Sequence, residues 1–364
     1  MSFRCGIVGL PNVGKTTIYN ALAQGKEQIS IAPFSTIQPK RGVVPVPDER
    51  VEKLVKVLDP KRVVRAHLDF LDVAGLVEGA SHGEGMGNQF LSHLRDVDIL
   101  LQVVRTFESE EAVHFLGSID PQRDINIVNK ELIMKDRDVV DRRIEKLEQK
   151  KNMPNFNPDF LELLHAVKGV LEEGHFVRHL DLSEDQIKLL KDTYLFTAKP
   201  MMYCVNVNKD DLPGGGKWEK DLVTFAQEDS SKIVFICGLL EEEMSRIEDK
   251  EKHSEIIEEF LLEHSGPSKV VHLGYDLLEK VTFFTHDHSE VRAWTIFKGT
   301  RAPQAAGHVH SDMERGFIRV EVVKWQDLVD AGSLQKARDN GHFKVEGKDY
   351  EIQDGDVVHF RFNV

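Results

Sequence analysis

The chain has 364 residues, 41% hydrophobic and 30% charged, which is the balance of an ordinary folded protein of two or three domains. No apolar stretch approaches the roughly 18 residues that cross a bilayer, and the first four residues lead directly into an apolar run. We therefore expect a cytoplasmic protein without a signal peptide or a membrane partner. The net charge of −14 argues against a protein that coats nucleic acid, and the three cysteines lie in apolar runs, as buried thiols do.

The first element is an apolar run, Phe3 to Val8, that predicts a buried strand. It is followed by Gly9-Leu10-Pro11-Asn12-Val13-Gly14-Lys15-Thr16, and then by a predicted helix from Thr17 to Ala23. The eight residues match G-x-x-x-x-G-K-[ST], the phosphate-binding loop of nucleoside triphosphatases, in the strand–loop–helix context that the motif requires. Glycines allow backbone N–H groups to turn toward phosphate oxygens, and the helix N-terminus adds partial positive charge. This segment therefore predicts a nucleotide site.

Two side chains of this loop and one further threonine are candidates for the chemistry. The Lys15 ammonium is expected to reach the β- and γ-phosphates and so to act in catalysis, and the Thr16 hydroxyl to ligate Mg²⁺. Thr36 lies between the first helix and the second predicted strand, where a mobile switch segment would bring another hydroxyl to the metal. The alternative for Thr36 is an ordinary loop threonine.

The second predicted strand, His67 to Asp72, ends in Asp72-Val73-Ala74-Gly75. Downstream of a phosphate loop, this D-x-x-G sequence predicts that Asp72 holds Mg²⁺, directly or through water, and that the Gly75 N–H senses the γ-phosphate. The next residue is Leu76, at a position where many GTPases have a Gln that orients the attacking water. Hydrolysis is therefore either slow until a partner helps, or assisted by another residue.

Asn12 and His114 are the candidates for that missing group. His114 follows the third predicted strand, Asp98 to Val104, near the carboxyl end, where ligands of α/β sheets bind. A purely structural histidine is the alternative.

A helical pattern replaces the alternation of strands and helices between residues 126 and 195. The apolar positions of the first two helices are Ile133, Val140, Ile144 and Leu147, and then Phe160, Leu164, Val167 and Leu171. The first set has the spacing of a coiled-coil seam. Ser183 and Gln186 form the capping-box pattern that opens a third helix. We predict a helical hairpin inserted as an arm, with helices packed on the common core as the alternative.

The segment that reads the nucleotide base follows the fourth predicted strand, Met201 to Val205. The residues Asn208-Lys209-Asp210-Asp211 match N-K-x-D, with which GTPases bind guanine. In such proteins, however, the Asn comes directly after the strand, which selects Asn206-Val207-Asn208-Lys209 instead. The fourth residue is then a hydrogen-bond donor, which is wrong for the donor edge of guanine. The two registers differ by about 6.6 Å along an extended chain. We therefore predict adenine over guanine.

The fifth predicted strand runs from Lys232 to Cys237, and from Val281 the sequence becomes rich in strand patterns. Residues 292–298 and 317–323 alternate in strand fashion, and a closing hairpin is predicted from His342 to Phe362. Between Lys280 and Val364 there are 12 basic and 13 acidic residues. This near-neutral part is compatible with contact to RNA, and equally with an ordinary mixed surface.

The predicted fold class is α/β. We expect a P-loop NTPase (G-domain) parallel sheet formed by residues 1–125 and 196–278, because strands alternate with helices there. Residues 126–195 would form the inserted helical coiled-coil arm, and residues 279–364 a C-terminal α+β domain.

Four segments together resemble the YchF/Obg-like ATPase family. They are Gly6 to Thr16, Asp72 to Val77, Ser81 to Asn88 and the terminal Gln353 to Val364. The resemblance covers essentially the whole chain. It implies an OBG-type nucleotide-binding domain, a coiled-coil arm and a C-terminal TGS domain of the β-grasp type.

The resemblance also implies an activity and partners. The family prefers ATP to GTP as substrate, associates with the ribosome, and has roles in translation and stress responses. We expect Mg²⁺ as cofactor, hydrolysis of ATP to ADP and phosphate, the large ribosomal subunit and its rRNA as contact surface, and a monomeric chain.

Site residues carry over by matching motif. The residues implied to hold the phosphates are Asn12, Val13, Gly14, Lys15, Thr16 and Thr17. Thr16 and Thr36 would hold Mg²⁺, and Val207, beside Asn206, would lie against the adenine. The family replaces the catalytic Gln by an apolar residue, as Leu76 does, and uses a histidine in a flexible loop, a position that His114 matches.

Three features depart from the family pattern. Ile-Ala-Pro-Phe precedes Thr36 in place of Asn-Tyr-Pro-Phe, Lys209 stands where the family has Glu, and the arm is short. Because Lys209 departs from the family pattern, the sequence leaves open how strictly the site selects adenine. Because the arm is short, the sequence also leaves open which partners the arm contacts. The alternatives to an ATPase are a conventional GTPase and a module whose bound nucleotide is a conformational cofactor with negligible turnover.

Overall fold

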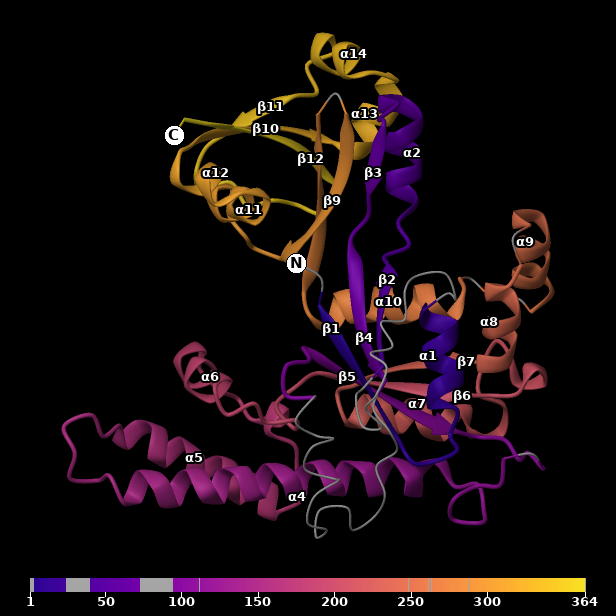
Figure 1. The fold of residues 1–364 in the computed structure, drawn as a ribbon, viewed down its shortest axis with the longest axis vertical. Helices are drawn as coiled ribbons and strands as arrows, with labels where there is room; N and C mark the ends of the chain where they lie inside the picture. Colours follow the sequence, from indigo (N-terminus) through magenta and orange to yellow (C-terminus); the bar gives the residue numbers. More distant parts are fainter. Residues whose placement is uncertain are drawn as a thin grey trace, which may run out of the picture. The chain divides into compact units, whose positions relative to one another are not determined.

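The computed structural model describes residues 3–23, 40–72, 94–110, 112–247, 249–260, 262, 264–287 and 289–363 (Figure 1). By their contacts the residues form two compact units, which we describe separately. The larger unit comprises residues 4–42 and 69–270, and the smaller unit residues 1–3, 43–68 and 271–364. The grouping of residues 43–68 with the C-terminal residues is not indicated by the alternation of strands and helices in the sequence.

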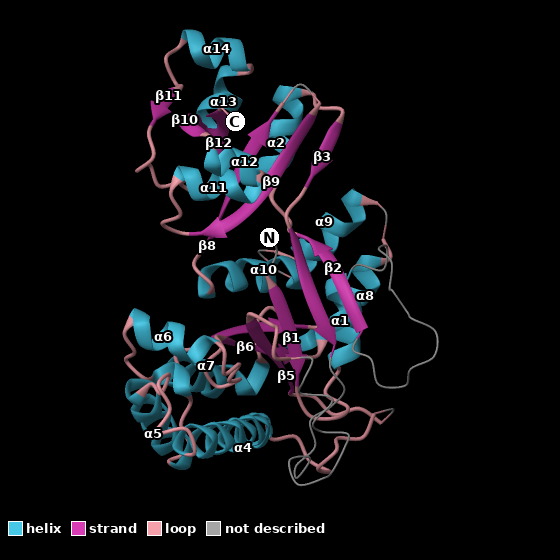
Figure 2. Ribbon diagram, turned by 60° about the vertical axis from the view of Figure 1, so that its left-hand side comes forward, coloured by secondary structure: helices cyan, strands magenta, loops and turns pink. Residues whose placement is uncertain are grey.

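A mainly parallel sheet is the centre of the larger unit. Its strand order is β2 (Lys40–Pro45), β4 (His67–Asp72), β1 (Arg4–Val8), β5 (Ile99–Arg105), β6 (Met201–Asn206) and β7 (Lys232–Ile236), and the residues of β2 and β4 are divided between the two units. β1 pairs in parallel with β4 and β5, β5 with β6, and β6 with β7 (Figure 2). Every residue of β5 and β6 is buried, as expected for central strands covered on both faces. The five strands predicted in this part of the chain are confirmed to within two residues at each end.

The larger unit also contains several helices. They are α1 (Lys15–Ala23), α4 (Pro121–Glu148), α5 (Pro158–Glu172), α6 (Glu184–Lys191), α7 (Glu219–Glu228), α8 (Gly238–Ser245) and α9 (Lys250–Glu259), with short 3-10 turns at Val177–His179, Lys209–Asp211 and Gly216–Trp218. α10 (Gly266–Leu277) crosses the division between the two units. Within the part of the chain that the structure describes, none of these helices has the length and apolarity needed to cross a membrane. All three cysteines are buried and free, as predicted.

α4 and α5 lie side by side and form the predicted helical hairpin (Figure 1). The predicted apolar seam is confirmed, because Val140, Ile144, Leu164 and Val167 are in one buried cluster. The capping box at Ser183 and Gln186 is also present. α4 is continuous from Pro121, so its first turns lie against the sheet, where the Gln102 side chain donates to the Ile125 carbonyl at 3.3 Å.

A buried carboxylate joins α4 to the segment that returns from the hairpin to β6. Asp136 accepts hydrogen bonds from the backbone N–H of Phe196 at 3.0 Å, and from the backbone N–H and hydroxyl of Thr197, both at 2.6 Å. Burial nevertheless raises its pKa from 3.8 to about 6, because desolvation outweighs these bonds.

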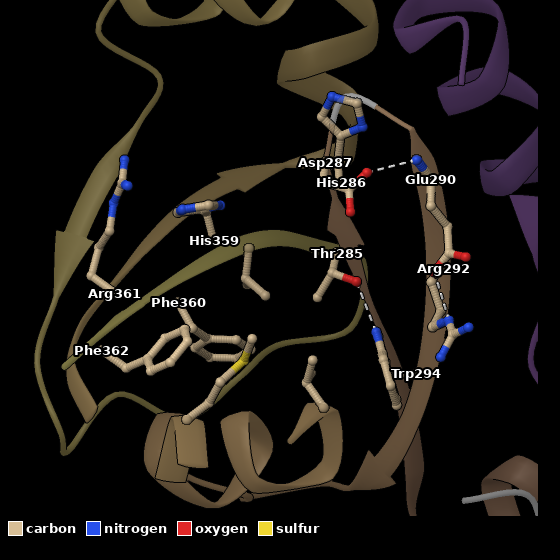
Figure 3. A pocket seen from close by; sticks show the side chains of 13 residues that line it. Thr285, His286, Asp287, Glu290, Arg292, Trp294, His359, Phe360, Arg361 and Phe362 are labelled. Carbon is tan, nitrogen blue, oxygen red and sulfur yellow. Dashed lines mark hydrogen bonds and ion pairs between the residues drawn. The ribbon is translucent and has the colours of Figure 1, made fainter. Parts of the chain in front are cut away.

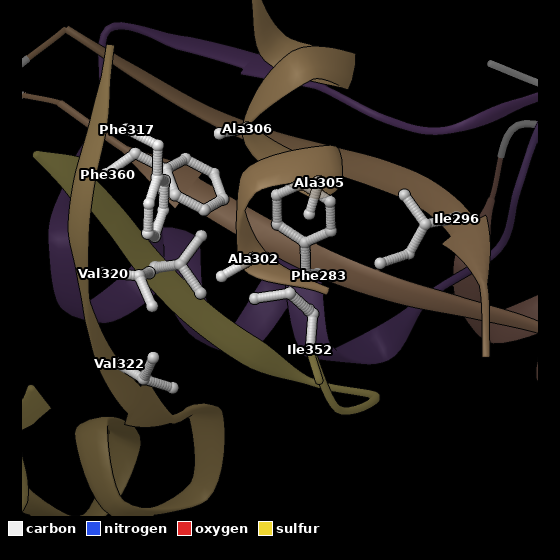
Figure 4. Packing of buried hydrophobic residues seen from close by; sticks show 11 residues of the cluster. Phe283, Ile296, Ala302, Ala305, Ala306, Phe317, Val320, Val322, Ile352 and Phe360 are labelled. Atoms are coloured by element: carbon white, nitrogen blue, oxygen red, sulfur yellow. The ribbon is translucent and has the colours of Figure 1, made fainter. Parts of the chain in front are cut away.

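The smaller unit contains a mixed sheet of order β11 (Lys344–Glu346), β10 (Phe317–Lys324), β12 (Asp356–Phe362), β8 (Lys280–His286), β9 (Glu290–Phe297) and β3 (Arg62–Val64). Its helices are α2 (Glu49–Leu58), α11 (Ala302–Val309), α12 (Ser311–Arg315), α13 (Trp325–Ala331) and α14 (Leu334–Asp339). α11 packs its small residues Ala302, Ala305 and Ala306 against Phe283 and other core side chains (Figure 4).

Arg50 explains why residues 43–68 belong to this unit. Its guanidinium donates to Asp48, which caps α2, and to Asp354 at 2.6 Å, and it lies 5.4 Å from the ring centre of Phe284. β3 then pairs in parallel with β9.

The predicted closing hairpin between His342 and Phe362 is wrong. β11 and β12 lie on opposite sides of β10, where Glu321 faces Val345 on one side and His359 on the other. The connecting residues instead pair with residues 300–302, since the Ile352 N–H donates to the Thr300 carbonyl at 3.0 Å. Ile352 is 1% exposed and belongs to the hydrophobic core of this unit, so the burial of its side chain favours this path over a hairpin.

Asp136 makes the stability of the larger unit depend on pH. The pKa of Asp136 in the folded state, about 6, lies above the ordinary 3.8, so the folded state binds the proton more tightly than the unfolded state does. The contribution of this proton to the free energy of unfolding is fully present below about pH 4 and is lost as the pH rises through 6. We expect this carboxyl to remove about 1 kcal/mol of unfolding free energy between pH 5 and pH 7. Urea denaturation of the wild type and Asp136→Asn at both pH values measures it. An equal change with pH in the two proteins contradicts the assignment.

Candidate nucleotide site

The phosphate loop occupies the turn from β1 to α1 and approaches its neighbours too closely for side chains at its glycines. Gly9 has φ +148°, and a Cβ there would lie 2.5 Å from the Val103 carbonyl oxygen. Gly14 has φ +92°, and a Cβ there would overlap the Asn206 side-chain nitrogen. Both positions therefore require glycine for conformation and for space.

Lys15 is buried and folded back over the loop. Its ammonium donates to the carbonyl oxygens of Leu10 at 2.6 Å and Gly9 at 3.2 Å. The other loop residues differ in exposure: Asn12 and Thr16 are exposed, Val13 is buried, and Gly14 and Thr17 are half-buried. Phosphate oxygens that reach the loop can compete with the two carbonyls for the Lys15 ammonium.

Asn206, the last residue of β6, joins the loop to the predicted base segment. Its side-chain nitrogen donates to the Val13 carbonyl at 3.1 Å, and its side-chain oxygen accepts from the Gly238 N–H at 3.1 Å. Val207 is buried, and its N–H donates to the Ile236 carbonyl, whereas Asn208 is exposed. Asn206, the first residue of the predicted segment Asn206-Val207-Asn208-Lys209, is therefore the residue that is bonded to the phosphate loop.

Lys209 forms an ion pair across this segment. Its ammonium lies 2.6 Å from a carboxylate oxygen of Glu243 in α8. Both side chains are substantially exposed, so the pair contributes little to stability. The ion pair does bring the Glu243 carboxylate next to position 209, where the family that the sequence resembles has Glu.

Arg105, at the end of β5, fixes the next segment to the phosphate loop. It is 1% exposed, and its guanidinium donates to the carbonyl oxygens of Phe107 (2.7 Å), Ala112 (2.6 Å) and Asn12 (3.1 Å). Burial lowers the pKa of this guanidinium, and the nearby Glu108 carboxylate offsets only part of that shift. Asn12 adds a bond from its side-chain nitrogen to the Val113 carbonyl at 3.2 Å.

His114 is the residue after Val113, and its side chain is buried. Its Nε2 lies 2.7 Å from an oxygen of Asp124 in the first turn of α4, and its Nδ1 accepts from the Leu116 N–H at 3.1 Å. Both ring nitrogens therefore have hydrogen-bond partners within the protein. His114 is one residue beyond Val113, which accepts the bond from Asn12.

Comparisons with known proteins identify the family. A family model described as "50S ribosome-binding GTPase" matches residues 4–151, and a YchF-GTPase C-terminal model described as "Protein of unknown function (DUF933)" matches residues 281–363. The chain is 41% identical to the "Ribosome-binding ATPase YchF" of Bacillus subtilis (strain 168), over 100% of both chains. The chain belongs to the YchF family.

Two further YchF proteins extend this result. The "Ribosome-binding ATPase YchF" of Escherichia coli O157:H7 is 40% identical over 100% of both chains. A solved structure described as the Schizosaccharomyces pombe YchF GTPase has a TM-score of 0.84 at 35% identity, and covers 99% of this chain and 98% of that one. The P-loop NTPase domain predicted from the sequence is thus confirmed, as is the family.

The predicted Mg²⁺ ligands of this YchF chain are only partly within the described residues. Thr16 is exposed near the start of α1, and Asp72 is the last residue of β4. Thr36, Gly75 and Leu76, and the side chain of Asp72, lie outside what the structure describes. The predicted ligands, two hydroxyls and one carboxylate, are oxygen donors, which is the set that Mg²⁺ prefers. The residues present therefore fit the ion.

Sequence reasoning missed Arg105 and Asp124. An arginine at the end of a mostly apolar strand is a signal, because a buried guanidinium must find several acceptors. Asp124 offered no such signal, since acidic residues are common in the first turn of a helix. The structure also pairs the predicted Asn12 with Val113, which spacing alone did not indicate.

The smaller unit has a separate pocket of about 420 Å³ where β8 and β12 diverge (Figure 3). Its walls include Arg292 and Arg361, but Arg292 lies 2.9 Å from Glu290 and Arg361 lies 3.0 Å from Glu321. Because these charges are neutralised within the unit, we assign no ligand to this pocket.

Asn206 and Asn208 provide a matched test of the base segment. Asn206→Ala removes both bonds that join the phosphate loop, β6 and Gly238, so we expect nucleotide affinity to fall at least tenfold, since each lost buried bond costs about 1–3 kcal/mol. Asn208→Ala changes an exposed side chain, and we expect less than about a twofold change. Titration with a fluorescent ATP analogue measures both. A larger loss in Asn208→Ala contradicts the register.

Proposed function

We propose that this YchF-family chain is a cytoplasmic, Mg²⁺-dependent ATPase that associates with the ribosome. It hydrolyses ATP to ADP and phosphate and acts as a nucleotide-controlled switch in translation and in stress responses. The observation that carries the proposal is the Asn206 carboxamide, which joins a phosphate loop to a base segment whose register disfavours guanine. The names of the curated relatives support both the ATPase activity and the ribosome as partner.

In this proposal the chain's own groups act mainly by position and charge. The Lys15 ammonium moves from the loop carbonyls to the β- and γ-phosphate oxygens, and the loop N–H groups, with that of Gly75, surround the same oxygens. Thr16, Thr36 and Asp72 would hold Mg²⁺, which supplies charge neutralisation at the phosphates when bound. His114 assists the attacking water, since Leu76 has no polar group with which to orient it.

The appended parts contact the ribosome in this proposal. Residues 279–364 would be a TGS domain of the β-grasp type, and the hairpin of α4 and α5 would be the coiled-coil arm. The mixed sheet with α11 packed on it, and the apolar seam at Val140 and Ile144, support these assignments. The large subunit and its rRNA are the expected surface, and the chain would act as a monomer.

Two other functions have specific support. GTP hydrolysis is favoured by the term GTPase, which appears in the description of the family model that matches residues 4–151 and in that of the Schizosaccharomyces pombe structure. A nucleotide-binding module with negligible turnover is favoured by His114, whose ring nitrogens are both engaged away from the loop.

Base preference is tested by one substitution and one matched control. We expect the wild type to bind ATP more tightly than GTP. Lys209→Asp places an acceptor for the guanine N–H groups at the fourth residue of the register, so we expect a shift of at least tenfold toward GTP. The loss of the exposed pair with Glu243 costs little. Asp211→Asn, which would remove the guanine reader of the alternative register, should change nothing. Competition between the two nucleotides measures the ratio.

If the wild type prefers GTP and Asp211→Asn abolishes that preference, the alternative register is correct and the GTPase assignment replaces ours.

The role of His114 is tested by turnover and affinity measured together. His114→Ala should lower the hydrolysis rate at least tenfold and change ATP affinity by less than about twofold, because a group that assists the water acts on the chemical step. His165→Ala, an exposed histidine of α5, is the control. Single-turnover kinetics with and without ribosomes give the rates. A wild-type rate that is negligible in both conditions would favour the binding module.

A further inference from the structure

The hydrogen bonds of the His114 ring define which nitrogen carries the proton. Because Nδ1 accepts the Leu116 N–H, it carries no proton, so the proton of the neutral ring is on Nε2 and is donated to Asp124 at 2.7 Å. The side chains of His114 and Asp124 are 4% and 3% exposed. In this state neither ring nitrogen can accept a proton from water.

Asp124 is itself held rigidly in place. Its other oxygen accepts from Nε and Nη2 of Arg123 at 3.0 and 2.8 Å, and its backbone N–H donates to Asp120, the residue that caps α4. Arg123 also donates to the Ser118 carbonyl at 2.8 Å. The carboxylate is therefore positioned by helix α4 and by Arg123, independently of His114.

Arg123 also lowers the cost of releasing His114. A buried carboxylate that loses its only partner is strongly destabilised, but one oxygen of Asp124 keeps both of its bonds from Arg123 when the imidazole leaves. The histidine can therefore exchange between Asp124 and another position without leaving an uncompensated charge.

The backbone of His114 is already close to the phosphate loop. Val113, directly before it, accepts from Asn12, and Arg105 bridges Asn12 and Ala112 through their carbonyls. Consecutive Cα atoms are about 3.8 Å apart, so a change confined to residues 114–116 would redirect the imidazole while residues 112–113 remain attached to the loop.

We propose that Asp124 is a latch that holds His114 in a resting position, and that turnover requires His114 to leave it. This inference rests on the proposed role of His114 in hydrolysis. Asp124 is then a positioning residue that lowers the basal rate, and a partner that stimulates turnover would act by displacing the pair. The opposite role, in which Asp124 orients His114 for catalysis as in a hydrolase triad, requires a free Nδ1, and Nδ1 is bonded to Leu116.

The two roles predict effects of opposite sign. Under the latch, Asp124→Asn weakens a charge-assisted bond while keeping the shape of the side chain, and we expect the basal single-turnover rate to rise at least threefold with ATP affinity unchanged. Asp124→Ala removes the bond and should raise the rate further. The matched control is Asp159→Asn, an exposed acid in the first turn of α5, which should leave the rate unchanged.

A double variant separates failure of the latch from failure of the proposed function. Asp124→Asn with His114→Ala should have the low rate of His114→Ala alone, because the gain acts through the imidazole. If His114→Ala lowers the rate but neither Asp124 variant raises it, the latch is overturned and the role of His114 stands. If His114→Ala has no effect, the catalytic role itself is overturned.

A spectroscopic measurement completes the test. In the wild type, the Nε2-bound proton of His114 should give a protected signal in ¹H–¹⁵N spectra of the imidazole groups, because it is buried and bonded to Asp124. The signal should be lost or exchange rapidly in Asp124→Ala. A protected signal that persists in Asp124→Ala would overturn the latch, since another acceptor would then hold the ring.

Discussion

The Asn206 carboxamide is the contact on which the nucleotide site depends. It is buried and joins Val13 of the phosphate loop to Gly238 at the start of α8, while Gly14 leaves the space that it occupies. One side chain thus sets the distance between the loop that would hold phosphates and the segment that would hold the base. A buried amide with both ends bonded has little freedom to move, so the two halves of the site are held together.

Arg105 extends the same arrangement to a third segment. Its guanidinium holds the carbonyls of Asn12 and Ala112, so the chain that carries His114 is attached to the phosphate loop. A buried arginine is stable only when its donors are satisfied, which explains why three carbonyl oxygens converge on it. The His114 imidazole, in turn, is held by the Asp124 carboxylate.

Much of the larger unit could be predicted from sequence because its signals are local. Buried parallel strands are continuous apolar runs, and a phosphate loop has fixed spacing, so β1, α1, β5 and β6 follow from patterns a few residues long. The hairpin at 342–362 was mispredicted because turn residues show where a chain bends but not which strand it joins. That choice depended on burying Ile352 beside residues 300–302.

The sequence by itself determined the phosphate loop and the family, since short motifs of fixed spacing specify them, and it predicted the register of the base segment and the helical insertion. Only the tertiary structure decided that residues 43–68 belong with the C-terminal unit through Arg50, that Lys209 pairs with Glu243, and that Asp124 holds His114. These contacts join side chains whose spacing follows no period of helix or strand. Their partners are selected by the burial of charge and by hydrogen-bond geometry, which exist only once the chain has folded.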